Sequence, residues 1–227
     1  MRVLIGPLAE ARLHELASDV ATRLAGPAGT VVSLRNAGVP DLSRLLSRAE
    51  VVLLREAMLG AVPQGQSADG AVRDNPIGYV CSGSLLTKQV ETRASAATAL
   101  IAVTDHADLT WRSPLTGPND DLVGPRFPGM TGIYATQIVG SRLGLTGHTL
   151  DPHHTRDGMI MTPGVVAGVK DDSCLSDHEA EIAQILACAG ASSELAPVAV
   201  VAAHLGLKVA AAVVALIERR ETPGGGS

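Results

Sequence analysis

The chain has 227 residues, a net charge of −5 and a hydrophobic content of 46%, but only 2% aromatic residues. This length suits one domain with a sizeable core, which Ala, Val and Leu must build. The acidic balance argues against nucleic acid or an anionic membrane as a partner. The three cysteines are odd in number and lack metal-ligand spacing, so we expect reduced thiols, no metal site and a cytoplasmic protein.

Short apolar runs alternate with helical patterns in the first part of the chain. Val3–Ile5 and Val31–Leu34 are predicted as buried strands, and Ala9–Leu24 as a helix because its leucines recur at helical spacing. Asp41–Arg48 is expected to form one or two helical turns, and Val51–Leu54 a third strand. This alternation predicts an α/β fold with a mixed β-sheet flanked by helices.

The middle of the chain contains the least periodic sequence. Gly60–Gly78 is predicted as a polar surface loop, Tyr79–Cys81 as a short strand, and Thr98–Val103 as another strand. Thr104–Tyr134 has no helix or strand period and contains four prolines, the only Trp and the only Phe. A loop of this length inside a compact domain is usually functional or disordered, and its aromatic residues favour a folded, functional loop.

The last third predicts a strand and two helices before a final apolar segment. The expected elements are a weak helix over Ile133–Leu143, a strand over Met159–Val169, helices over Ser176–Ala189 and Ala196–Leu205, and a strand or helix over Lys208–Ile217. Ser176 and Glu179 form a capping box, and Ile182, Ile185, Leu186 and Ala189 are expected to be buried. The final apolar run includes His204, Gly206 and Lys208, which argues against a membrane span. We expect one domain over residues 1–222 and a flexible tail over 223–227.

The long loop carries a resemblance to a known family. Asp105-His106, Ser113-Pro114-Leu115, Gly117-Pro118-Asn119 and Gly124-Pro125-Arg126-Phe127-Pro128 resemble the D-H-x-N-L, N-P-L-x-G-P-N and G-x-R-F-P motifs of trimeric purine nucleoside phosphorylases. The resemblance implies a nucleoside phosphorylase-like fold and a homotrimer. It also implies an enzyme that cleaves the N-glycosidic bond of a purine-type nucleoside, with phosphate as co-substrate and no cofactor. In that family the aromatic of R-F-P reaches the neighbouring subunit's ribose site, which is here the position of Phe127; a lone Phe that fills the core is the other interpretation.

The family's base-binding segment is similar to the region around Asp177. Aligned on Ala180-Glu181, Asp177 stands where the family has its base-binding Glu, which makes Asp177 the candidate catalytic and base-contacting residue. The shorter side chain reduces its reach by one methylene. The alternative is that Asp177 and Glu179 only stabilise a helix N-terminus, where acidic residues are favoured.

The phosphate-binding segments depart most from the family. The turn after the first strand is Gly6-Pro7, in which Pro7 lacks an N–H donor. The resemblance leaves Arg55, Ser82 and Ser84 as phosphate-binding candidates, with Asn36–Gly38 as a less favoured alternative for the Ser82–Ser84 turn. Ser193 and Glu194 are candidate substrate-binding residues. Glu194 stands where the family has a phosphate-binding Ser, and a carboxylate would repel phosphate.

Two kinds of function therefore remain open from the sequence. The first is an enzyme that cleaves a nucleoside, with phosphate or with water as the nucleophile. The second is an inert homologue that binds a nucleoside or a protein partner. A scaffold recruited for other chemistry on a nucleoside-like substrate is a third possibility.

Overall fold

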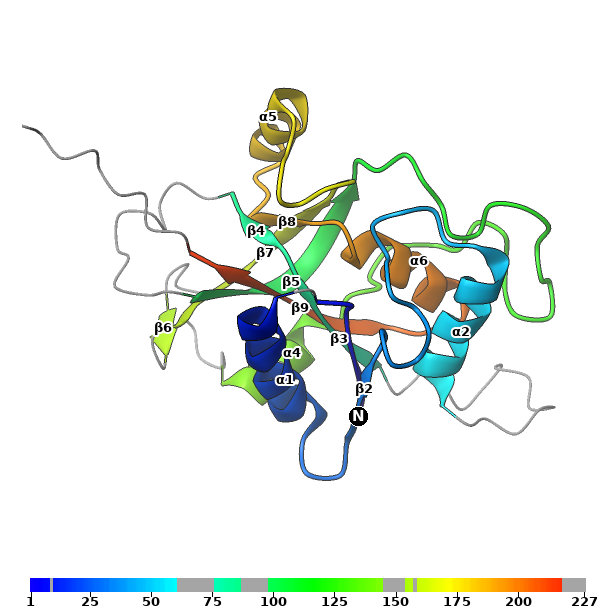
Figure 1. Ribbon diagram of the computed structural model, residues 1–227, viewed down its shortest axis with the longest axis horizontal. Helices are drawn as coiled ribbons and strands as arrows, with labels where there is room; N and C mark the ends of the chain where they lie inside the picture. The colour runs from blue at the N-terminus through cyan, green and yellow to red at the C-terminus, as the bar shows by residue number, and fades with distance from the viewer. Residues whose placement is uncertain (9, 61–75, 87–97, 145–153, 157–158, 218–227) are drawn as a thin grey trace, which may run out of the picture.

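The computed structural model describes residues 1–8, 10–60, 76–86, 98–144, 154–156 and 159–217. Its strands are β1 (Arg2–Ile5), β2 (Thr30–Ser33), β3 (Ile77–Ser82), β4 (Ser84–Leu85), β5 (Thr98–Asp108), β6 (His154–Arg156), β7 (Met159–Gly168), β8 (Gly190–Ser192) and β9 (Val209–Leu216). Its helices are α1 (Ala11–Ala25), α2 (Arg48–Leu59), α4 (Thr136–Leu143), α5 (Asp177–Ile185) and α6 (Leu195–His204). The predicted α/β fold with a mixed sheet flanked by helices is confirmed (Figure 1).

The strands form one sheet that bends back on itself. Its order is β2-β1-β3-β9-β5-β7-β8-β4, with β6 paired to β7. The first four strands of this order run parallel, and β5 runs antiparallel to β9. Only Gly83 separates β3 from β4, and β4 pairs with β8 at the far end of the sheet order. The end of β3 therefore lies beside β8, and the strand path closes.

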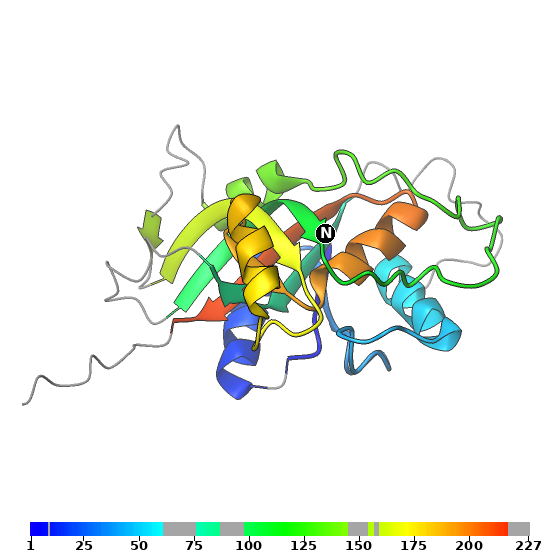
Figure 2. The ribbon, with the colours of Figure 1, turned by 90° about the horizontal axis from the view of Figure 1, so that it is seen from above.

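The helices cover the two faces of the sheet as separate layers. Val3 and Ile5 pack on the face covered by α1 and α4, whereas Leu4 packs on the face covered by α2 and α6, as expected from strand alternation. Figure 2 shows α2 and α6 side by side, with the long loop running along their outer side. Tyr79 and Cys81 belong to the α2 and α6 side of the core. Within the described residues, no helix combines the length and the apolar character that a membrane crossing needs.

The prediction of a third strand at Val51–Leu54 is wrong. Val51–Leu54 lies inside α2, whose N-cap Ser47 forms a capping box with Glu50, and no helix precedes Arg48 within Asp41–Ser47. The buried residues of α2 are Val51, Leu54, Ala57 and Met58, which follow a helical period. The short Val-Val-Leu-Leu run by itself resembles a strand, whereas the capping box before it specifies the start of a helix.

Two further expectations need correction. β5 continues to Asp108, so Thr104–Asp108 belongs to a strand, with an irregular register between Val103 and Asp105, and not to the long loop. The predicted buried stripe of α5 is exposed at Ile182, Leu186 and above all Ile185, whose exposure is 75%. A short helix at the surface of the chain does not bury a face merely because that face is apolar. Most of Gly60–Gly78 and all of the predicted tail lie outside the described residues.

The capping box at the start of α5 is confirmed, and it gives a stability prediction. Ser176 Oγ accepts a hydrogen bond from Glu179 N at 3.3 Å, and Glu179 Oε2 accepts one from Ser176 N at 2.9 Å. Ser176→Ala should lower the free energy of unfolding by about 1 kcal/mol, because the cap is lost. Urea denaturation measures this. Ser18→Ala, in the interior of α1 and away from its N-cap, is the control and should cause no loss. Equal effects of both variants would contradict the stabilising role of the Ser176 cap.

Candidate functional site

Three chain segments meet where the parallel strands β1, β2 and β3 end. Gly6 follows β1 and donates its N–H to Val80 O at 2.9 Å, while Leu34 follows β2 and donates to Ile5 O at 2.9 Å. Arg35 comes next and is exposed. Ser82 ends β3. The Gly6 turn, Arg35 and the Ser82–Ser84 turn thus share one edge of the sheet, where ligands of α/β proteins commonly bind.

Ser192 joins this edge to the start of α6. Its hydroxyl donates to Ser82 O at 2.8 Å and accepts from Glu194 N at 3.3 Å. The Cys81 thiol lies 3.5 Å from the same hydroxyl oxygen. β8 has only three residues, so Ser192 stands between the closing strand and α6. This hydrogen bonding fixes the position of Glu194, the N-cap residue of α6.

The Glu194 side chain is buried against Gly6 and Tyr79. Its exposure is only 7%, and its Oε2 accepts a hydrogen bond from the Tyr79 hydroxyl at 3.3 Å. A Cβ atom added to Gly6 would overlap with that carboxylate oxygen. A larger residue at the end of β1 would have to displace the Glu194 carboxyl, so the absence of a side chain at Gly6 makes room for it. The carboxyl group of Glu194 occupies the space over the Gly6 turn.

Glu194, Tyr79, Cys81, Ser192 and Asp172 form a buried group, which we call the Glu194 cluster. Burial and neighbouring acids disfavour ionisation within it. Burial, and then the charge of Asp172, raise the pKa of Glu194 to about 8. Burial is also the main cause that raises the pKa of Asp172, whose Oδ2 accepts from Ser193 N at 3.3 Å. Burial raises the pKa of the Tyr79 hydroxyl and of the Cys81 thiol well above their ordinary values. The Glu194 carboxyl is mostly protonated at neutral pH and titrates just above it, the range in which general acids and bases work best.

Of the residues predicted from the sequence, four lie around this cluster. Glu194 and Ser193 are buried at the start of α6, and Ser82 accepts the hydrogen bond of Ser192 through its backbone oxygen. Ser84 lies one residue past Gly83, and its buried hydroxyl has no hydrogen-bond partner among the described residues. The Ser82–Ser84 turn follows β3, and the alternative turn, Asn36–Gly38, follows β2.

Arg55 lies on a different element from the one expected. It belongs to α2, not to a strand end, and its Nη1 lies 3.5 Å from Asp120 Oδ2 in the long loop. Burial lowers the pKa of Arg55, and its Nε has no hydrogen-bond partner within the described part of the chain. This arrangement ties α2 to the loop. The groups that shift the Glu194 pKa do not include Arg55.

The long loop, which now spans residues 109–134, contacts the end of α6, and its Phe127 side chain is exposed. His204, buried at the end of α6, has its Nδ1 2.9 Å from Pro125 O, and Asn119 Nδ2 donates to Gly124 O at 3.0 Å. Phe127 is 86% exposed, and the guanidinium of Arg126 lies 5.8 Å from its ring centroid. The side chain therefore does not fill the core of this chain, which was the alternative interpretation.

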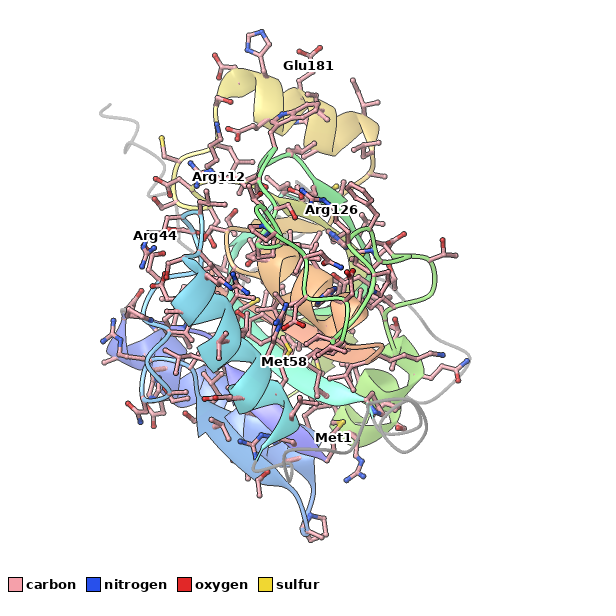
Figure 3. All side chains as sticks on the ribbon, turned by 90° about the vertical axis from the view of Figure 1, so that its right-hand side faces the viewer. Met1, Arg44, Met58, Arg112, Arg126 and Glu181 are labelled. Atoms are coloured by element: carbon pink, nitrogen blue, oxygen red, sulfur yellow. The ribbon has the colours of Figure 1, made fainter. Side chains whose placement is uncertain are left out.

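Asp177 lies apart from the buried cluster. It is exposed in the first turn of α5, beside the capping residues Ser176 and Glu179. Figure 3 shows α5, marked by Glu181, at the top of the molecule, above Arg112 and Arg126. The hydrogen bonds described for Glu194 and Tyr79 do not involve Asp177. Its place fits the alternative interpretation, a helix N-terminus that favours acids.

The sequence interpretation missed most partners of Glu194. Tyr79 on β3, Asp172 before α5 and Ser192 at the end of β8 come from three separate segments, and no linear motif joins them. Arg35 was also missed, although a charged residue directly after a short apolar strand is a signal of a sheet-edge position. Within the described residues, no group of three or more His, Cys, Asp or Glu side chains is arranged to hold a metal ion.

The cavities found among the described residues lie outside the buried cluster. One, of ≈20 Å³, includes Ser193, Thr110, Arg44 and Arg112 in its lining, and this volume suits about one water molecule. A second, of ≈220 Å³, lies where β5 and β7 begin, against Leu16 and Val20 of α1. A third, of ≈240 Å³, lies beside it against Leu16 and Thr98, and neither of these two is lined by a candidate site residue.

Solved structures with a similar fold are purine nucleoside phosphorylases. Isoform 2 of the Schistosoma mansoni enzyme, solved in complex with cytosine and ribose-1-phosphate, aligns with a TM-score of 0.59 and 18% identity, over 95% of this chain and 75% of that one. A second S. mansoni structure, in complex with acetate, reaches a TM-score of 0.45 at 18% identity, over 62% of this chain and 48% of that one. No protein-family model and no curated protein matches the sequence. The comparison therefore establishes a distant nucleoside phosphorylase-like fold.

Proposed function

We propose that the protein cleaves the N-glycosidic bond of a purine-type nucleoside at the Glu194 cluster. The observation that carries the proposal is the convergence of the Gly6 turn, the Ser82–Ser84 turn and Glu194 at one sheet edge of a nucleoside phosphorylase-like fold. These segments are far apart in the sequence, and each was assigned to the same site by the family resemblance. Their convergence supports one functional site.

Cleavage of the N-glycosidic bond requires the protein mainly to position the reacting groups and to stabilise the charge that develops on the sugar and the base. In the transition state the sugar becomes cation-like and the base becomes anion-like, so carboxyl groups near the sugar are favourable. The proposal covers phosphate or water as nucleophile, because in both reactions the base leaves with the electron pair of the C–N bond. Asp177 remains the proposed base contact only if α5 approaches the ligand in the assembled protein.

We further propose a homotrimer in which Phe127 borders the nucleoside site of a neighbouring subunit. A large aromatic side chain that is 86% exposed, on a loop anchored to α6 through His204, is well placed for such a contact. Light scattering on the eluted protein should give a mass near three times 23.3 kDa. A monomer would contradict the assembly proposal. The three free cysteines agree with the proposed cytoplasmic location.

The proposed function is tested by following free base. Purified protein is incubated with inosine, guanosine and adenosine, with and without inorganic phosphate, and the products are separated by chromatography. Base released from at least one nucleoside, in either buffer, is the expected result. Absence of base under every condition would overturn the proposal.

Replacing Phe127 should weaken nucleoside use without destabilising the subunit. Phe127→Ala should raise KM about tenfold or more, equivalent to about 1.4 kcal/mol, because the neighbouring site loses an apolar wall. The fold of the single chain should not change, since the side chain is 86% exposed on its own chain, and circular dichroism checks this. Trp111→Ala is the matched control, because Trp111 is also exposed, at 91%, on the same loop. Equal KM changes in both variants would contradict the ribose-wall role.

Binding without turnover is the second candidate function. It is favoured by the exposed position of Asp177 and by the ion pair between Arg55 and Asp120, which leave two predicted site residues outside the cluster. A nucleoside that raises the melting temperature without releasing base would support this candidate.

A further inference from the structure

Among the described residues, the most exposed large apolar side chains belong to the long loop and to α5. Leu122, Trp111 and Phe127 of the loop are exposed by 94%, 91% and 86%, and Ile185 of α5 is exposed by 75%. Trp111 comes at the start of the loop, whereas Leu122 and Phe127 lie on either side of the segment that contacts His204. Large apolar side chains that gather on a folded surface mark a place that another molecule covers.

Ile185 belongs to a continuous apolar face of α5, formed together with Ile182 and Leu186. These three residues have the spacing of neighbours on one side of a helix, and Ile182 and Leu186 are 43% and 46% exposed. Ala183, on another side of α5, is buried and packs with residues of β7 and β8. In Figure 1, α5 stands out at the top of the molecule. The helix is thus attached to the sheet through Ala183, and its apolar face is turned to solvent.

The loop and α5 carry opposite charge. The loop places Arg126 directly before Phe127, with the guanidinium 5.8 Å from the ring centroid. Asp121, which precedes Leu122, has its Oδ1 hydrogen-bonded to Asn119 Nδ2 at 2.6 Å. The α5 sequence has no Lys or Arg and contains the acids Asp177, Glu179 and Glu181. An apolar patch beside an arginine and an apolar face on an acidic helix are complementary, and aromatic and arginine side chains are enriched at protein interfaces.

Two different and complementary patches on one chain allow copies of that chain to associate in a closed ring. Each copy then contacts the next copy with one patch and receives the previous copy on the other. Within its own chain, the loop is held by α6 through His204 and by α2 through Arg55. We propose that the apolar face of α5 receives the Leu122–Phe127 segment of a second copy of this chain. This rests on the proposed homotrimer and adds to it the surface that receives the loop.

Ile185→Lys tests the α5 face without weakening the helix itself. A lysine at this position lies four residues after Glu181 and close to the helix C-terminus, and both features stabilise α5 in the single chain. It also brings a positive charge toward the partner subunit's Arg126. By light scattering, wild type should have a mass near three times 23.3 kDa, and the variant a mass near 23.3 kDa at the same concentration. Val52→Lys, at a 42% exposed position of α2, is the matched control and should keep the wild-type mass.

Cross-linking identifies which residues meet. In a Cys174→Ser background, which removes the exposed thiol, Phe127→Cys and Ile185→Cys are placed on separate chains that carry different tags. The two chains are produced together and treated with a short bismaleimide. A cross-linked pair that carries both tags should form. Neither variant alone should give a cross-linked pair, because the contact joins two different patches.

The outcomes separate this docking surface from the proposed assembly and from the proposed activity. A trimeric wild type whose mixed sample gives no cross-link would overturn the docking surface and leave the homotrimer standing. Cross-links within either variant alone, or a folded Ile185→Lys that stays trimeric by light scattering, would also overturn it. A monomeric wild type would overturn both the docking surface and the homotrimer. Neither experiment measures free base, so absence of base would contradict only the proposed cleavage.

Discussion

Glu194→Gln should make the protein more stable, and the gain should grow with pH. The pKa of Glu194 is raised from its ordinary value of 4.5 to about 8 in the folded protein. As pH rises above about 4.5, the unfolded chain releases this proton while the folded protein keeps it, so wild-type stability falls until about pH 8. At about 1.4 kcal/mol per pH unit, this loss amounts to about 4 to 5 kcal/mol.

Glutamine removes the loss because it cannot ionise. It is nearly isosteric with glutamate, and its amide oxygen can still accept the hydrogen bond of Tyr79. The difference in unfolding free energy between variant and wild type should be smallest below about pH 4.5 and largest above about pH 8. Asp172 also has a raised pKa, so some pH dependence of the same sign remains in both proteins.

Urea denaturation at a series of pH values measures this difference. Glu181→Gln is the control, since Glu181 is exposed and its replacement should leave the pH dependence unchanged. Parallel curves for wild type and Glu194→Gln would contradict the buried, protonated carboxyl described above.

Gly124→Ala should detach the long loop from the end of α6. A Cβ atom at this position would overlap with the backbone oxygen of His204 and lie 3.1 Å from its Nδ1. His204 is buried at 1% exposure, so the helix end cannot move aside at low cost. We expect a loss of about 2 kcal/mol or more in unfolding free energy, and faster proteolytic cleavage of the loop.

Gly129→Ala is the matched control for the loop. Apart from its chain neighbours, no described atom lies within 4 Å of a Cβ built at Gly129, and this position also belongs to the loop. It should therefore leave stability and proteolysis unchanged. If the two alanine variants behave alike, the contact between Gly124 and His204 does not fix the loop.

The fold could be predicted from the sequence where local signals agreed. The apolar runs of β1 and β9, and the capping box of α5, each gave the correct element because burial pattern and local chemistry pointed the same way. At Val51–Leu54 they did not: the short apolar run suggested a strand, while the preceding Ser47 and Glu50 specified a helix start. A helix signal from capping outweighs a four-residue apolar run.

The candidate site was predictable only in part. Glu194 was identified because it departs from a motif, but the sequence could not give its burial, since that follows from contacts with Gly6 on β1 and Tyr79 on β3. Such contacts depend on the closing of the sheet through β4 and β8, which no local pattern encodes. The outward position of Phe127 similarly follows from the anchoring of its loop by His204.

The most direct test follows the NMR signal of the Glu194 carboxyl carbon as the pH is changed, in protein labelled with carbon-13 at its glutamate side chains. It measures whether the carboxyl is buried and whether a nucleoside binds beside it. Glu194→Gln identifies the signal by its loss. We predict an apparent pKa of about 8 in the free protein and a further change when inosine or guanosine is added. An apparent pKa near 4.5 that no nucleoside alters would contradict both the buried carboxyl and its place in a nucleoside site.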